Sequence, residues 1–109
     1  MKPKMNPKWE KIRKIIRKDA NVQNTYKDED GKTCVLGGLA EAAHIKLPKL
    51  IYNSESIDHK ALQSFRKQLK KVYGLNNFQL DELQNINDNN DVLRERRYRL
   101  IEFTKFEEQ

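Results

Sequence analysis

The chain has 109 residues, a formal net charge of +6 and a sequence pI near 9.5, with 35% charged and 37% hydrophobic residues. This length predicts one domain with a modest core, and the single cysteine excludes an internal disulfide and argues against a Cys-rich metal site. No apolar run approaches the ~18 residues that span a bilayer, so we expect a cytoplasmic protein without membrane contact. The positive net charge favours anionic partners.

The first predicted helix follows Asn6-Pro7, because Asn caps helices well and Pro suits the first helical position. Its apolar residues fall at three- and four-residue steps on one face: Trp9, Ile12, Ile15 and Ile16. Basic residues fill most of the remaining positions. Two interpretations stay open for this basic exterior, a solvated face or a contact surface for an anionic partner formed by Lys11, Lys14 and Lys18.

The polar stretch 21–32 contains a turn signal at Asp30-Gly31 and three acidic residues without the spacing of a known metal loop. We expect no metal and no cofactor. In the next segment, 33–45, Glu41 is the only charged residue, which predicts a short buried helix capped by Thr33. Gly37 and Gly38 each cost about 1 kcal/mol inside a helix, which indicates the close approach of another helix.

Residues 46–57 allow a short strand, a helical turn or an apolar loop, and the apolar residues 50–52 suggest a dimer contact, so a monomer and a homodimer both stay open. Ser56 or Asp58 is expected to cap the next helix, which Gly74 ends in a left-handed conformation. This helix has the clearest apolar period in the chain. Its outer face is basic, with candidate contact residues Lys67, Lys70 and Lys71.

A short helix is predicted to end at Asn87, and Asp88 or Asp91 is expected to cap the last helix. The last helix carries the third basic group: Arg96, Arg97 and Arg99. The predicted fold is all-α, a compact single-domain bundle of about five short helices around the central buried helix. We expect residues 1–5 and 106–109 to be flexible.

Two segments carry a family resemblance. Residues 31–40, Gly-Lys-Thr-Cys-Val-Leu-Gly-Gly-Leu-Ala, resemble the Gly-x-x-Cys-x-x-Gly-Ala-Leu-x-x-Ala segment of a family of small uncharacterised bacterial and phage proteins. That family also has an Asn-Asp pair before its last helix, matched by Asn87 and Asp88, and some members have an Arg-Arg pair like Arg96-Arg97. The chain departs at Gly38, usually Ala, and at His44, where Gly often ends the helix. The family has no assigned activity, so the resemblance implies a shape and no site.

Cys34 is the candidate nucleophile, because a helix dipole stabilises a thiolate in the first turn. A catalytic thiol needs a base, and His44 lies ten residues on, about 15 Å away along a helix. His59 approaches only through folding, and Asn87 or Asp88 would then orient it. The alternative is an inert packing cysteine. Asn87 or Asp88 is in that case expected to hydrogen-bond the first turn of the Cys34 helix, which joins the two signature segments.

The leading hypothesis is a small, basic, non-catalytic binding protein. By analogy with the resembling family, we expect a phage-type modulator or inhibitor of a host or defence macromolecule that acts through protein–protein contacts in an infected bacterium. The first alternative is a nucleic-acid-binding protein that uses the basic helix faces. The second alternative is an enzyme with Cys34 as the nucleophile.

Overall fold

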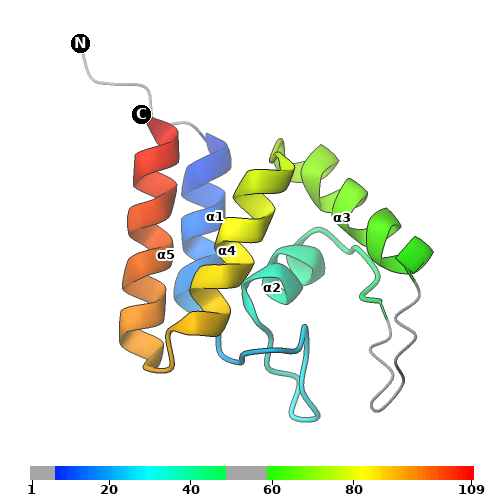
Figure 1. Ribbon diagram of the computed structural model, residues 1–109, viewed down its shortest axis with the longest axis horizontal. Coiled ribbons are helices and arrows are strands. Elements are labelled where there is room, and N and C mark those ends of the chain that lie inside the picture. Colours follow the sequence, from blue (N-terminus) through cyan, green and yellow to red (C-terminus); the bar gives the residue numbers. More distant parts are fainter. Residues whose placement is uncertain (1–6, 49–58) are drawn as a thin grey trace.

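The computed structural model describes residues 7–48 and 59–109, and in these ranges it confirms an all-α single domain (Figure 1). It contains five helices: α1 (Pro7–Lys18), α2 (Val35–Ala42), α3 (His59–Tyr73), α4 (Asn77–Asn89) and α5 (Leu93–Glu108). Helices α1, α4 and α5 run alongside one another, and α3 projects to one side (Figure 1). The Ser56 and Asp58 caps and the 50–52 dimer contact fall outside the described residues.

The prediction of a central buried helix is confirmed for most of α2. All six residues from Val35 to Ala40 are buried, whereas Glu41 and Ala42 are exposed. Helix α2 packs against α1 and α4, and the Tyr73 hydroxyl of α3 donates a hydrogen bond to the Leu39 carbonyl. The apolar stripes of the surrounding helices therefore converge on a short, nearly uncharged segment.

The predicted cap of α2 is wrong by one residue. Cys34 is the N-cap, and its Sγ accepts from the Gly37 N–H at 3.4 Å. Thr33 instead forms an isolated antiparallel bridge with Lys27, and its carbonyl accepts from the Asn21 N–H at 2.7 Å. This pairing holds Thr33 in the loop before the helix, so the next residue takes the capping position.

The paired glycines of α2 do permit a close approach, but the approaching segment is the loop after α1 and not another helix. A Cβ on Gly37 would stand 2.0 Å from the carbonyl oxygen of Tyr26. A Cβ on Gly38 would stand 2.6 Å from the Cβ of Asp19. Neither distance is compatible with a side chain unless its neighbours move. The absence of a side chain at both glycines therefore allows the loop after α1 to pack against α2.

Two helices end in left-handed residues. Gly74 has φ +64° and the Leu75 N–H donates to the Lys70 carbonyl, as predicted for the end of α3. His44 has φ +56° after α2, and the Ile45 N–H donates to the Ala40 carbonyl in the same motif. The departure from Gly at this position therefore leaves the helix end in place and adds the strain of a side chain in left-handed backbone.

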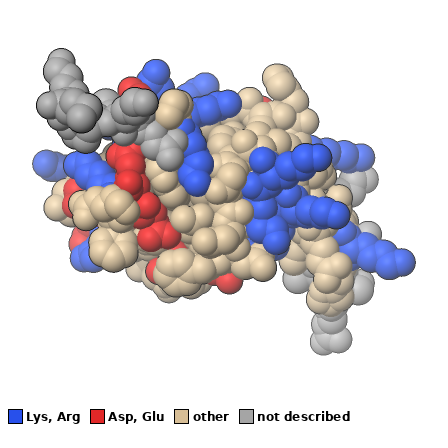
Figure 2. All heavy atoms as spheres, turned by 90° about the horizontal axis from the view of Figure 1, so that it is seen from above, with Lys and Arg blue, Asp and Glu red and all other residues tan. Residues whose placement is uncertain are grey.

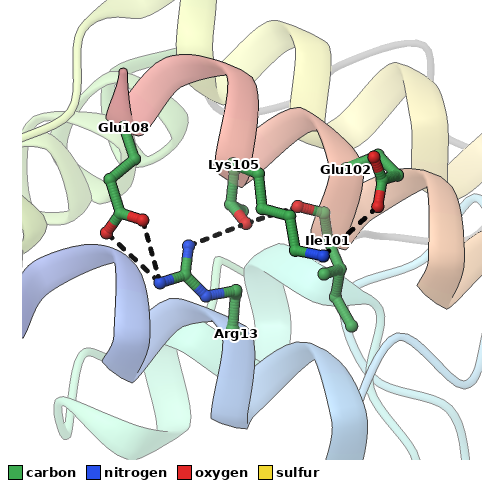
Figure 3. Close-up of polar contacts among 6 residues, drawn as sticks. Arg13, Ile101, Glu102, Lys105 and Glu108 are labelled. Carbon is green, nitrogen blue, oxygen red and sulfur yellow. Dashed lines mark hydrogen bonds and ion pairs between the residues drawn. The ribbon is translucent and has the colours of Figure 1, made fainter. Parts of the chain in front are cut away.

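The predictions for the last two helices need correction. Helix α4 continues two residues beyond Asn87, and Val92 is the N-cap of α5 without a side-chain hydrogen bond, so neither predicted aspartate caps that helix. Helix α5 continues to Glu108, so residues 106–108 are helical, and the flexibility expected of 106–109 stays a prediction. Glu108 is held by Arg13, which is buried although its place on α1 predicted an exposed residue (Figure 3).

Candidate functional site

The two signature segments meet at Asn87, whose side chain is 1% exposed. Its Oδ1 accepts from the Val35 N–H at 3.0 Å, and its Nδ2 donates to the Val22 carbonyl at 2.9 Å and to Asp88 Oδ1 at 3.0 Å. The Val35 N–H is one of the free donors in the first turn of α2. The predicted hydrogen bond between the Asn-Asp pair and this turn is confirmed, with Asn87 as the acceptor.

Asp88 extends the same network to the loop before α2. Its Oδ1 also accepts from the Asn24 N–H at 3.0 Å. Gln23 Nε2 donates to the main-chain carbonyls of Asn87 and Asp88, which lie near the end of α4. The network joins α4, the loop and α2 through main-chain groups. This use of both side chains is structural.

Cys34 is a buried thiol with an unfavourable environment for a nucleophile. It is 5% exposed, and burial raises its pKa to about 11, although the Gly37 N–H bond opposes this rise. Desolvation therefore raises the thiol pKa more than the N-terminus of α2 lowers it, so the reactive thiolate that the sequence suggested is disfavoured. His44 lies beyond the far end of α2 and His59 is exposed at the start of α3, and no histidine in ranges 7–48 and 59–109 bonds the thiol.

The Arg96–Arg97 pair binds oxygen atoms that follow α1 and α4, most of them main-chain carbonyls. Arg96 is 4% exposed and donates to Ala20 O at 2.7 Å and to Asn90 O at 2.8 Å. Arg97 donates to Asp19 O at 3.2 Å and to Asn21 Oδ1 at 2.7 Å. The end of a helix presents free carbonyls and a partial negative charge, which guanidinium groups satisfy.

The prediction that Arg96 belongs to a partner-binding surface is therefore wrong, because the residue is buried and bonded within the chain. Arg97 is half-buried and similarly engaged. Arg99 is exposed and pairs with Glu95 at 3.0 Å. The third predicted basic group thus forms a fastening between α5 and α1, with Arg99 alone on the surface.

The other two basic groups partly come together. Lys8 Nζ donates to Gly74 O at 2.7 Å, and Lys11 Nζ lies 5.7 Å from the Tyr73 ring centroid, so the first turns of α1 adjoin the end of α3. Lys67 and Lys71 are exposed one turn apart, with Lys70 half-buried beside them. Lys14 and Lys18 are also exposed, but Lys18 ends α1 at the Arg97 contact, away from α3.

Lysine and arginine side chains gather over α3 in the view from above, while an acidic strip lies toward the end of α5 (Figure 2). No Asp or Glu occurs between His59 and Tyr73. Arg66 pairs with Asp81 of α4 at 2.6 Å. The positive charge on the outer face of α3 therefore comes mainly from the lysines next to Arg66 in the helix. We call Lys11, Lys67, Lys70 and Lys71 the α3 basic face.

Three exposed aromatic residues of α4 and α5 were not predicted as surface residues from the sequence: Phe78 (60% exposed), Tyr98 (63%) and Phe106 (72%). Phe78 belongs to the apolar spacing, with Leu80 and Leu83, that is typical of its helix. Tyr98 and Phe106 fall outside the buried stripe of α5 that Leu100 represents. A helix with apolar residues outside its buried stripe is the signal that could have identified them.

The chain matches no known family model, no curated protein and no solved structure. The resemblance noted at residues 31–40 and 87–88 therefore stays a prediction. None of the helices in the described ranges has the length and apolar character that crossing a membrane requires. In those same ranges no cluster of three or more His, Cys, Asp and Glu side chains is arranged to hold a metal ion.

Proposed function

We propose that this protein is a non-catalytic binding protein whose α3 basic face contacts the phosphate backbone of a nucleic acid. The single observation that carries the proposal is the charge of this face. Lys67 and Lys71 project one turn apart from a helix without any carboxylate, Lys70 lies on the same helix beside them, and Lys11 lies near Tyr73 at the end of that helix. Such a cationic surface attracts a polyanion, and α3 has no carboxylate that would repel the phosphates.

The flanking contacts support this assignment. Lys67, Lys70 and Lys71 form no ion pair with any residue in ranges 7–48 and 59–109, whereas Arg66 on the inner side of α3 is paired. A lysine loses hydration and side-chain freedom when it binds a phosphate. A lysine already in an ion pair would also have to break that pair, which is a second cost. These three lysines are free of that second cost.

The proposed binding is independent of base sequence. Lysine ammonium groups are point charges that contact phosphates, and phosphate contacts position a protein on a duplex without reading bases. Side chains that read base edges with two hydrogen bonds, such as Arg, Asn and Gln, are represented on the outer turns of α3 by Gln63 and Gln68. Gln68 Nε2 already bonds Ser64 within the helix.

The protein-modulator hypothesis stays the second candidate, and the observation that favours it is the set of exposed aromatic residues on α4 and α5. Its original contact residues lose support, since Arg96 and Arg97 fasten α5 to α1. The thiol-enzyme hypothesis has the least support, because Cys34 is buried with a raised pKa and no histidine in the described ranges bonds its thiol.

The test is the salt dependence of binding to a labelled duplex, measured by fluorescence anisotropy with duplex DNA and duplex RNA. Four lysine–phosphate contacts predict a slope of log K against log salt of about −3 to −4. Raising the salt fourfold, from about 50 to about 200 mM, is then expected to weaken binding roughly 100-fold. If neither the DNA duplex nor the RNA duplex binds at the lower salt concentration, the proposal is wrong.

A further inference from the structure

Exposed residues of α3 occupy more than half of the circumference of the helix. Its buried residues are Phe65, Leu69 and Tyr73. The exposed residues run from His59 to Val72 and, at about 100° per residue, cover an arc of about 220°. Figure 1 shows α3 on the side of the molecule opposite α5. The helix therefore stands out from the body of the protein along its length of about 22 Å.

The exposed side of α3 carries hydrogen-bond donors and no carboxylate. The central residues of the exposed arc are Lys60, Gln63, Ser64, Lys67, Gln68 and Lys71. All six side chains have donor groups, which phosphate and base oxygens accept. On the flank of the helix, Arg66 pairs with Asp81 of α4 and so offsets the repulsion of phosphates by this carboxylate.

The same side of α3 lacks the aromatic rings that single-stranded nucleic acids require. Proteins that bind single strands stack the unpaired bases on exposed aromatic side chains. The one Tyr among the exposed and buried residues of the last turn of α3, Tyr73, is 4% exposed. The exposed rings of Phe78, Tyr98 and Phe106 belong to α4 and α5. The exposed side of α3 therefore favours a double strand.

The shape of α3 distinguishes between the two kinds of duplex. An α-helix with its side chains is about 10–12 Å across, and the major groove of B-form DNA is about 12 Å wide and about 8.5 Å deep. The major groove of A-form RNA is too narrow for side chains to read, and its minor groove is wide and shallow. A helix that is exposed over so wide an arc can enter a deep groove, whereas contact with a shallow surface uses a narrower face.

We propose that α3 enters the major groove of B-form DNA with its exposed side, so that DNA and not duplex RNA is the partner of the α3 basic face. Lys67 and Lys71 lie near the middle of the exposed arc, and their flexible four-carbon stems let the ammonium groups reach the phosphates on either wall of the groove. Lys11, near Tyr73 at the end of α3, then lies beside the groove. This inference rests on the proposed function, because it names the nucleic acid that the same face binds.

The first measurement compares three duplexes of one sequence and length, titrated with the full chain at about 50 mM salt and followed by anisotropy. They are DNA, RNA, and DNA whose cytosines carry a glucosylated hydroxymethyl group on C5, which fills the major groove and leaves the backbone charge unchanged. We expect unmodified DNA to bind at least about tenfold more tightly than either of the others. Equal binding of RNA or of the glucosylated DNA would overturn this inference and leave the proposed function standing. Binding of none of the three would overturn both.

The second measurement identifies the groove that α3 occupies. Ser64→Cys places a thiol near the middle of the exposed arc, and Cys34 is buried and does not compete. The DNA carries a thiol tether either on C5 of a pyrimidine, in the major groove, or on N2 of guanine, in the minor groove. We expect a disulfide cross-link to form at least about tenfold faster with the major-groove tether, and faster than with Asn85→Cys, an exposed control on α4. Equal rates for the two tethers, or for the two variants, would contradict the insertion of α3.

Discussion

Replacing Asn87 with alanine tests whether one buried amide holds the two signature segments together. The change removes the acceptor of the Val35 N–H and the donor to the Val22 carbonyl, both at about 3 Å. A buried backbone group that loses its partner costs about 1–3 kcal/mol. Two such groups, together with the space left by a fully buried side chain, predict a loss of about 3–5 kcal/mol in the free energy of unfolding.

The assay is urea unfolding followed by circular dichroism, with Asn85→Ala as the control on an exposed position of the same helix. A domain of this size is expected to be stable by about 5–15 kcal/mol, so the Asn87→Ala midpoint should move far below that of the control. Asn87→Asp keeps an acceptor for Val35 and places a carboxylate against Val22 O and Asp88. It is expected to cost nearly as much. A loss below about 1 kcal/mol for Asn87→Ala would refute the role assigned to this side chain.

Four further predictions concern α2 and its ends. Gly37→Ala is expected to destabilise the protein by about 3 kcal/mol or more, because its Cβ would stand 2.0 Å from Tyr26 O; unfolding in urea like the wild type would contradict this. His44→Gly is expected to stabilise it by about 1 kcal/mol, measured as a higher Tm, since glycine removes the strain at φ +56°; a lower Tm would show that His44 contributes contacts instead. The Cys34 thiol should resist a thiol reagent until the chain unfolds, and prompt reaction in the folded state would contradict its burial. Because its folded pKa of about 11 exceeds the ordinary value of 9.0, this group's contribution to stability should fall as pH rises from about 9 to about 11.

Hydrophobic periodicity accounted for most of the fold. The steps between Trp9, Ile12 and Ile16 identified the buried face of α1, and the same kind of spacing predicted α3, in which Phe65 and Leu69 are buried. The low charge of 33–45 identified α2 as the central helix. These predictions succeeded because the burial of an apolar stripe dominates helix packing in a domain of this size.

The polar fastenings were less predictable, because their partners are distant in sequence. Arg96 is 76 residues from Ala20, whose carbonyl it binds, and Arg13 is 95 residues from Glu108. A basic residue on a helix is usually exposed, so both arginines were predicted to be solvent-exposed because of their charge. The pairing of Thr33 with Lys27 likewise moved the cap of α2 to Cys34. The contact of Asn87 or Asp88 with the first turn of α2 was predictable, because the free N–H groups of a helix start need acceptors, and Asn87 Oδ1 supplies one.

The most direct test of the proposed function compares two charge reversals in the same duplex titration. Lys67→Glu/Lys71→Glu alters the α3 basic face, and Arg17→Glu/Lys32→Glu gives the same net charge at exposed positions elsewhere. The account predicts that the first variant loses at least about tenfold in affinity and that its salt slope becomes shallower by about 2, while the control stays close to the wild type. Equal losses in both variants would mean that overall charge, and not this face, attracts the nucleic acid.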